Sequence, residues 1–113
     1  MSRKLKILIV FGTRPETIKM APVIKELNKH KEHFDPVVCV TGQHREMIDS
    51  LLKLFEIKVD YDLNLMQKNQ SLEHITSTVL KEIGEILDKE QCDYLMVQGD
   101  TTTAMAAMTG FMA

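Results

Sequence analysis

Short apolar runs alternate with segments of helical periodicity along the whole chain, and this alternation predicts the fold. Apolar runs that are bounded by polar or turn residues are typical of buried strands. We expect strands at Leu5–Phe11, Phe34–Val40 and Tyr94–Gln98, and a short edge strand within Val59–Leu63.

Four segments have apolar residues at the three- and four-residue spacing of a helix with one buried face. The first of these helices places Ile18, Ala21, Ile24 and Leu27 on its buried face, and Pro22 predicts a kink or loosened first turns. The four expected helices are 15 to about 28, one that opens at 43–46, 71 to about 88, and 101–113.

Strands that alternate with helices predict an α/β fold with a doubly wound, Rossmann-like parallel sheet. Right-handed crossovers place helices on both faces of such a sheet. The three main strands each end near a glycine, at Gly12, Gly42 and Gly99. Ligands of these sheets bind at the carboxyl ends of the strands, so we expect the three turns to converge on one crevice.

The first of these turns has the features of an anion site. Gly12 and Thr13 connect the strand to a helix, and Arg14 and Lys19 add two positive charges. Helix N-termini present unpaired N–H groups, which favour phosphate. The alternative is that both cations are solvated surface charges and that Gly12 only forms a turn.

The third turn also has two interpretations. Asp100 is followed by Thr101 and Thr102, whose hydroxyl groups could bind an anion or a sugar. Asp is also among the best residues for a helix N-cap, so Asp100 could instead have a purely structural role.

Composition and charge exclude several classes of function. The chain has 113 residues, one domain's worth, with a net charge of −2 and 5% aromatic residues, which argues against a nucleic-acid partner. No apolar run approaches the length of a membrane span or a signal peptide, so we expect a cytoplasmic protein without a membrane partner. Cys39, Cys92 and the four histidines show no metal-ligand spacing.

Three strand-end stretches resemble the motifs of a known family. These stretches are Phe11–Pro22, Thr41–Met47 and Gln98–Thr103. In order and spacing they resemble the non-hydrolysing UDP-N-acetylglucosamine 2-epimerases, and the resemblance covers the whole chain.

The resemblance implies a two-domain enzyme of the GT-B type that is a homodimer. Members interconvert UDP-GlcNAc and UDP-ManNAc for surface polysaccharides, by elimination of UDP to 2-acetamidoglucal and re-addition. They need no metal or nicotinamide cofactor. Residues 1–113 would be an incomplete N-terminal domain, because the last helical pattern still runs at Ala113. The uridine-binding second domain and the catalytic glutamates would lie outside this chain, which we therefore expect to be inactive alone.

The resemblance also implies site residues. Asp100 matches the acidic active-site residue, and Asn69 stands where many bacterial members carry a regulatory Arg. The expected substrate-binding residues are Gly12, Thr13, Arg14, Lys19, Thr101 and Thr102, and the expected regulatory residues are Gln43, Arg45 and Gln70.

Other functions remain open at this stage. The alternatives are a GT-B glycosyltransferase, a hydrolysing UDP-GlcNAc 2-epimerase domain, and a binding domain without catalytic activity.

Overall fold

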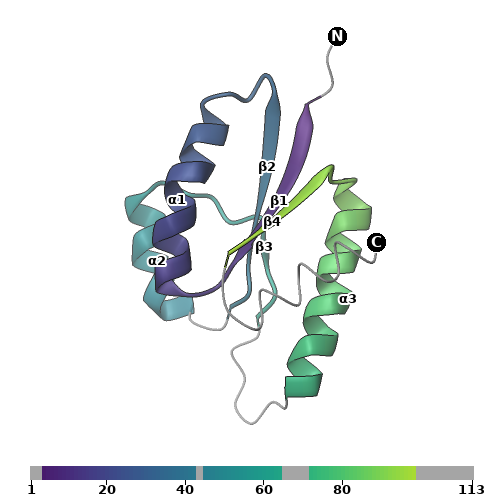
Figure 1. The fold of residues 1–113 in the computed structure, drawn as a ribbon. Coiled ribbons are helices and arrows are strands. Elements are labelled where there is room, and N and C mark those ends of the chain that lie inside the picture. The colour runs from purple at the N-terminus through teal and green to yellow at the C-terminus, as the bar shows by residue number, and fades with distance from the viewer. Residues whose placement is uncertain (1–3, 43–44, 65–71, 99–113) are drawn as a thin grey trace.

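A computed structural model describes residues 4–42, 45–64 and 72–98 (Figure 1). Four strands alternate with three helices in this part of the chain. In order they are β1 (Leu5–Phe11), α1 (Arg14–Asn28), β2 (Phe34–Val40), α2 (Arg45–Leu54), β3 (Tyr61–Asp62), α3 (Leu72–Glu90) and β4 (Tyr94–Val97).

The strands form one parallel sheet in the order β3-β2-β1-β4. Figure 1 shows α1 and α2 on one face of this sheet and α3 on the other. The Rossmann-like, doubly wound architecture expected from the sequence is therefore confirmed, and β3 lies at an edge of the sheet as predicted.

β1 contributes residues to the hydrophobic core on both faces of the sheet. Ile7, Ile9 and Phe11 pack in the cluster that contains α1 and α2 residues, whereas Leu8 and Val10 pack in the cluster that contains α3 residues. All five are buried. Burial on both faces explains why β1 is apolar at every position from Ile7 to Phe11 rather than at alternate positions.

The buried face of α1 differs from the expected one at a single position. Ile18 is 47% exposed, whereas Thr17 is fully buried together with Met20, Ala21 and Ile24. The stripe therefore begins at Thr17, which is three and four residues before Met20 and Ala21. A threonine is tolerated there because its hydroxyl donates to the Thr13 carbonyl at 2.8 Å.

A left-handed residue ends α2. The N–H of Ile57 donates to the Leu52 carbonyl at 2.9 Å, and that of Glu56 donates to the Lys53 carbonyl at 3.1 Å. These two bonds form a Schellman motif, and Glu56 has the left-handed φ of 56° that such a motif requires. Glycine is the usual residue at this position because a Cβ is unfavourable there.

No helix within the described residues is long and apolar enough to cross a membrane.

Candidate functional site

The carboxyl ends of three strands lie side by side at one edge of the sheet. In the parallel register Phe11 is paired with Val40, and Val10 is paired with Val97. Hydrogen bonds continue this pairing into the turns, because the N–H of Thr41 donates to the Phe11 carbonyl at 3.0 Å and that of Gln98 to the Val10 carbonyl at 3.4 Å. The predicted convergence of the turns is thus confirmed at their starting points.

The first turn is closed by a capping box. The side chain of Thr13 accepts a hydrogen bond from the Glu16 N–H at 3.4 Å. In return, Glu16 Oε1 accepts hydrogen bonds from the N–H groups of Gly12, at 2.7 Å, and Thr13, at 3.3 Å. Glu16 is 6% exposed, so two donors of the expected anion site already bind the carboxylate of a buried residue.

The two cations of the first motif point in different directions. Arg14 is the first residue of α1 and Lys19 follows five residues later, about 140° around the helix and about 7.5 Å along it. Both are exposed, and neither has a carboxylate partner among the described residues. Arg14 is therefore beside the strand ends, whereas Lys19 is on the outer face of α1.

The second turn needs a glycine for two reasons. Gly42 has a φ of +84°, a left-handed value that residues with a side chain rarely adopt. A Cβ on Gly42 would also lie 2.6 Å from Asp62 Oδ1 and 2.8 Å from the Asn64 backbone. The turn after β2 is therefore packed directly against the chain that leaves β3.

Several predicted site residues lie outside the described part of the chain. They are Gln43, Gln70, Asp100, Thr101 and Thr102, and the Arg45 side chain has the same status although its backbone begins α2.

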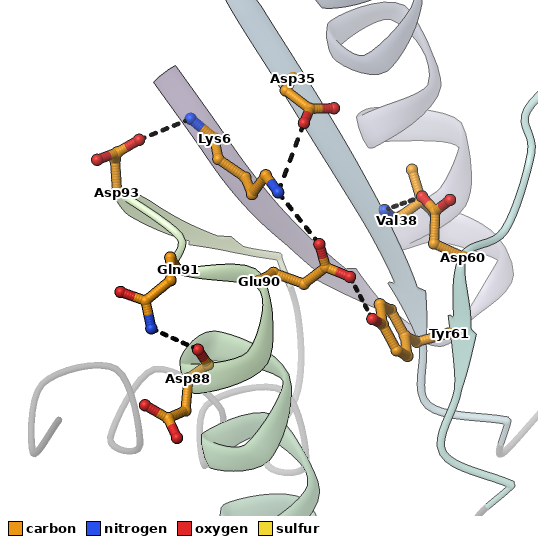
Figure 2. A network of polar contacts seen from close by, with 9 residues as sticks. All are labelled: Lys6, Asp35, Val38, Asp60, Tyr61, Asp88, Glu90, Gln91 and Asp93. Carbon is orange, nitrogen blue, oxygen red and sulfur yellow. Dashed lines mark hydrogen bonds and ion pairs between the residues drawn. The ribbon is translucent and has the colours of Figure 1, made fainter. Parts of the chain in front are cut away.

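The opposite edge of the sheet carries a polar network that no sequence pattern predicted (Figure 2). Lys6 Nζ lies 3.2 Å from Glu90 Oε1 and 3.7 Å from Asp35 Oδ2. The Tyr61 hydroxyl donates to the other oxygen of Glu90. The Lys6 N–H donates to Asp93 Oδ2 at 2.8 Å. The network thereby connects β1, β2, β3 and the residue before β4 to the C-terminus of α3.

Hydrogen bonding perturbs the titration of this network. The hydrogen bond from Tyr61 to Glu90 raises the pKa of Tyr61 to about 12. A second hydrogen bond, from Lys6 to Glu90, is the main cause of the raised pKa of Lys6. In return, the bonds from Tyr61 and then Lys6 lower the pKa of Glu90. The hydrogen bonds therefore favour a charged Glu90 carboxylate and a neutral Tyr61 phenol. This is a structural rather than a catalytic arrangement.

The thiols and carboxylates of the described residues do not form a metal site. No group of three or more His, Cys, Asp or Glu side chains there could hold a metal ion. Cys39 is fully buried, and this burial raises the pKa of its thiol to about 12, so it is a core residue.

Comparison with known proteins decides the family. The family model of UDP-N-acetylglucosamine 2-epimerase matches residues 25–113. The chain belongs to this family. The match includes the second and third strand-end motifs, and the first motif lies before it in the chain.

Curated members of the family align with nearly the whole chain. The UDP-N-acetylglucosamine 2-epimerase of Neisseria meningitidis is 55% identical over 103 residues, or 91% of this chain. That of Bacillus subtilis is 50% identical over 104 residues, or 92% of this chain. In both cases the aligned region is 27% of the relative, so the chain spans about a quarter of the length of these relatives.

Solved structures of family members share the fold. The N. meningitidis UDP-GlcNAc 2-epimerase, crystallised with bound UDP-GlcNAc, matches with a TM-score of 0.85 and 52% identity over 96% of this chain and 30% of its own. The enzyme from Methanocaldococcus jannaschii matches with a TM-score of 0.80 and 31% identity over 94% of this chain and 28% of its own.

Sequence reasoning overlooked Glu16 as a residue of this edge. The signal was present, because Thr13 and Glu16 have the spacing of a capping box immediately before an apolar stripe. In such a box the N3 carboxylate accepts hydrogen bonds from the backbone of the turn, as Glu16 does here.

Proposed function

We propose that these residues are the N-terminal part of an enzyme that interconverts UDP-GlcNAc and UDP-ManNAc. The observation that carries the proposal is the 55% identity to the N. meningitidis epimerase over 91% of the chain. A related crystal structure contains UDP-GlcNAc, and another, from S. aureus, contains UDP. The adjacent strand ends described above supply the edge at which such a nucleotide sugar would bind.

The complete enzyme is proposed to have a second, UDP-binding domain and to be a cytoplasmic homodimer. The relatives are more than three times as long as this chain, which supports an incomplete Rossmann-like domain within a GT-B-type protein. Activity would then need groups from the second domain, so the 113 residues alone are expected to be inactive.

The reaction divides into an elimination and an addition across the same two carbon atoms of the sugar. A base removes the proton on carbon 2 of the sugar while UDP leaves from carbon 1, and this gives 2-acetamidoglucal and UDP. UDP then adds back to carbon 1, and a proton returns to the opposite face of carbon 2. Such an elimination needs a positioned base and positive charge near the departing diphosphate.

We propose the following roles for the residues of this edge. Arg14 is exposed beside the strand ends and lacks an acidic partner among the described residues, so its guanidinium is suited to the diphosphate. Lys19 would meet a ligand that approaches the outer face of α1. The other proposed roles are substrate binding by Gly12, Thr13, Thr101 and Thr102, acid–base or orienting action by Asp100, and regulation by Gln43, Arg45 and Gln70.

Product analysis of the full-length protein with UDP-GlcNAc tests this proposal. We expect UDP-ManNAc with no net release of UDP. Free ManNAc with stoichiometric UDP would instead indicate a hydrolysing epimerase, transfer of the sugar to an added acceptor would indicate a glycosyltransferase, and no turnover would indicate a binding domain.

Two variants of α1 test the role of Arg14 in the same assay. Arg14→Gln should lower kcat/KM about 100-fold, which is typical for the loss of one group that stabilises charge in the transition state. Lys25→Gln is the matched control, because Lys25 is an exposed cation of the last turn of the same helix. Equal activity of the two variants would show that Arg14 is only a solvated surface charge.

A further inference from the structure

The carboxylate of Glu16 occupies the position at which a helix N-terminus ordinarily binds an anion. Its Oε1 atom accepts hydrogen bonds from the N–H groups of both Gly12 and Thr13, at 2.7 and 3.3 Å. These are the kind of backbone donors that bind a phosphate at a strand-to-helix turn. The side chain is buried, so a protein group fills the position that a ligand phosphate would need.

The charge of Glu16 also acts on any ligand at this edge. No cation among the described residues forms an ion pair with it, and its charge is stabilised by the two N–H groups and the helix dipole. A phosphate could use these donors only if the carboxylate left, because two anions repel each other strongly at contact distance. Recognition of a diphosphate here therefore falls to side chains such as that of Arg14.

Hydrogen bonds also connect Glu16, through Gly12 and Phe11, to both described turns. The N–H of Gly12 donates to the Glu16 carboxylate. Gly12 directly follows Phe11, and the Phe11 carbonyl accepts the hydrogen bond from the Thr41 N–H in the second turn. The side chain of Thr13 holds the backbone of Glu16 in return. A shift of Gly12 would therefore move the start of α1, where Arg14 lies, relative to the second turn.

We propose that Glu16 is a positioning residue of the enzyme, an internal anion that excludes phosphate from the backbone of the first turn and fixes the placement of Arg14. The effect on turnover rests on the proposed epimerase function. The exclusion of anions does not, because it follows from the occupied N–H groups alone.

Three variants of the full-length protein test this inference, with inorganic phosphate as the probe. In Glu16→Ala the two N–H groups become free. We expect kcat to fall about 10- to 100-fold because Arg14 is misplaced. We also expect the KM for UDP-GlcNAc not to rise, and phosphate to raise the melting temperature more than in the wild type. A general loss of stability would not produce this combination.

The conservative variant and a control on the same helix complete the test. Glu16→Gln should retain most of the turnover and a wild-type response to phosphate, because its amide oxygen can accept the same two hydrogen bonds. Glu26→Gln should resemble the wild type, because Glu26 is exposed and contacts only Lys29 and His30 among the described residues.

Two results would overturn the inference. One is a phosphate response of Glu16→Ala equal to that of the wild type, and the other is a folded Glu16→Gln that loses turnover as Glu16→Ala does. If Glu16→Ala does not fold, the turnover of a folded Glu16→Gln protein decides whether Glu16 is a positioning residue. A wild-type protein without epimerase activity would refute the proposed function, and the phosphate response would still decide whether Glu16 excludes anions.

Discussion

Replacement of Gly42 by alanine tests the packing of the second turn against the β3 strand. The new Cβ would lie 2.6 Å from Asp62 Oδ1 and 2.8 Å from the Asn64 N and Cα atoms, where ordinary contacts begin at 3.4 Å. The carboxylate could move only by disturbing its hydrogen bond from the Asn64 N–H, which is 2.8 Å long. The Asn64 contacts are to backbone, so the strand end itself would have to shift.

The structure gives the size of the expected loss. Overpacking of this kind costs about 1–3 kcal/mol, and an alanine at a left-handed φ costs about 1–2 kcal/mol more, so Gly42→Ala should lower the free energy of unfolding by about 2–5 kcal/mol. This is a large part of the roughly 5–15 kcal/mol that stabilises a typical domain.

Urea denaturation followed by circular dichroism measures this loss. Gly84→Ala is the matched control, because Gly84 lies inside α3 without a left-handed φ and should be neutral or stabilising by about 0.5–1 kcal/mol. A Gly42→Ala protein within about 0.5 kcal/mol of the wild type would refute the packing described for this turn.

Three further predictions concern the core, a helix terminus and the polar network. Ile24→Ala should lower the free energy of unfolding by about 2–5 kcal/mol, whereas Ile18→Ala should lower it by no more than about 0.5 kcal/mol; equal losses in urea denaturation would contradict the observed face of α1. Glu56→Gly should stabilise by about 1 kcal/mol because it relieves a left-handed φ, and Glu56→Ala, the control, should give no such gain. The pKa of Tyr61 is raised from 10.0 to about 12, so its contribution to stability is present below pH 10 and lost as the pH rises toward 12. The pKa of Glu90 is lowered from 4.5, so its contribution is lost as the pH falls below that value. Tyr61→Phe should therefore destabilise most at neutral pH, and a loss that does not vary with pH would argue against the network.

The sequence predicted those parts of the fold that depend on local patterns. β1 and β2 have the expected bounds, because each contains a run of consecutive apolar residues of the kind that a strand covered on both faces needs, Ile7–Phe11 in β1 and Val37–Val40 in β2. α1 begins at Arg14 rather than Pro15, and its Thr13 and Glu16 form a recognisable capping box. The error at Ile18 arose because hydrophobicity alone cannot identify a buried threonine whose hydroxyl bonds to its own helix.

Contacts between distant segments could not be predicted in this way. Lys6 meets Glu90 only because β1 lies between β2 and β4, and 84 residues separate the two side chains. The close approach of Gly42 to Asn64 depends in the same way on the register of β2 and β3. At the candidate site, the motifs predicted that the strand-end turns share one edge of the sheet, whereas the occupation of the backbone donors of the first turn by Glu16 required coordinates.

The central claim is that this chain belongs to an enzyme that epimerises a nucleotide sugar by elimination and re-addition. Proton NMR of UDP-GlcNAc in D2O with the full-length protein tests it most directly. We predict that deuterium enters at carbon 2 while UDP-ManNAc appears, and that the 113 residues alone cause neither the exchange nor the epimerisation. UDP-ManNAc that keeps the original proton at carbon 2, or no exchange with the full-length protein, would contradict it.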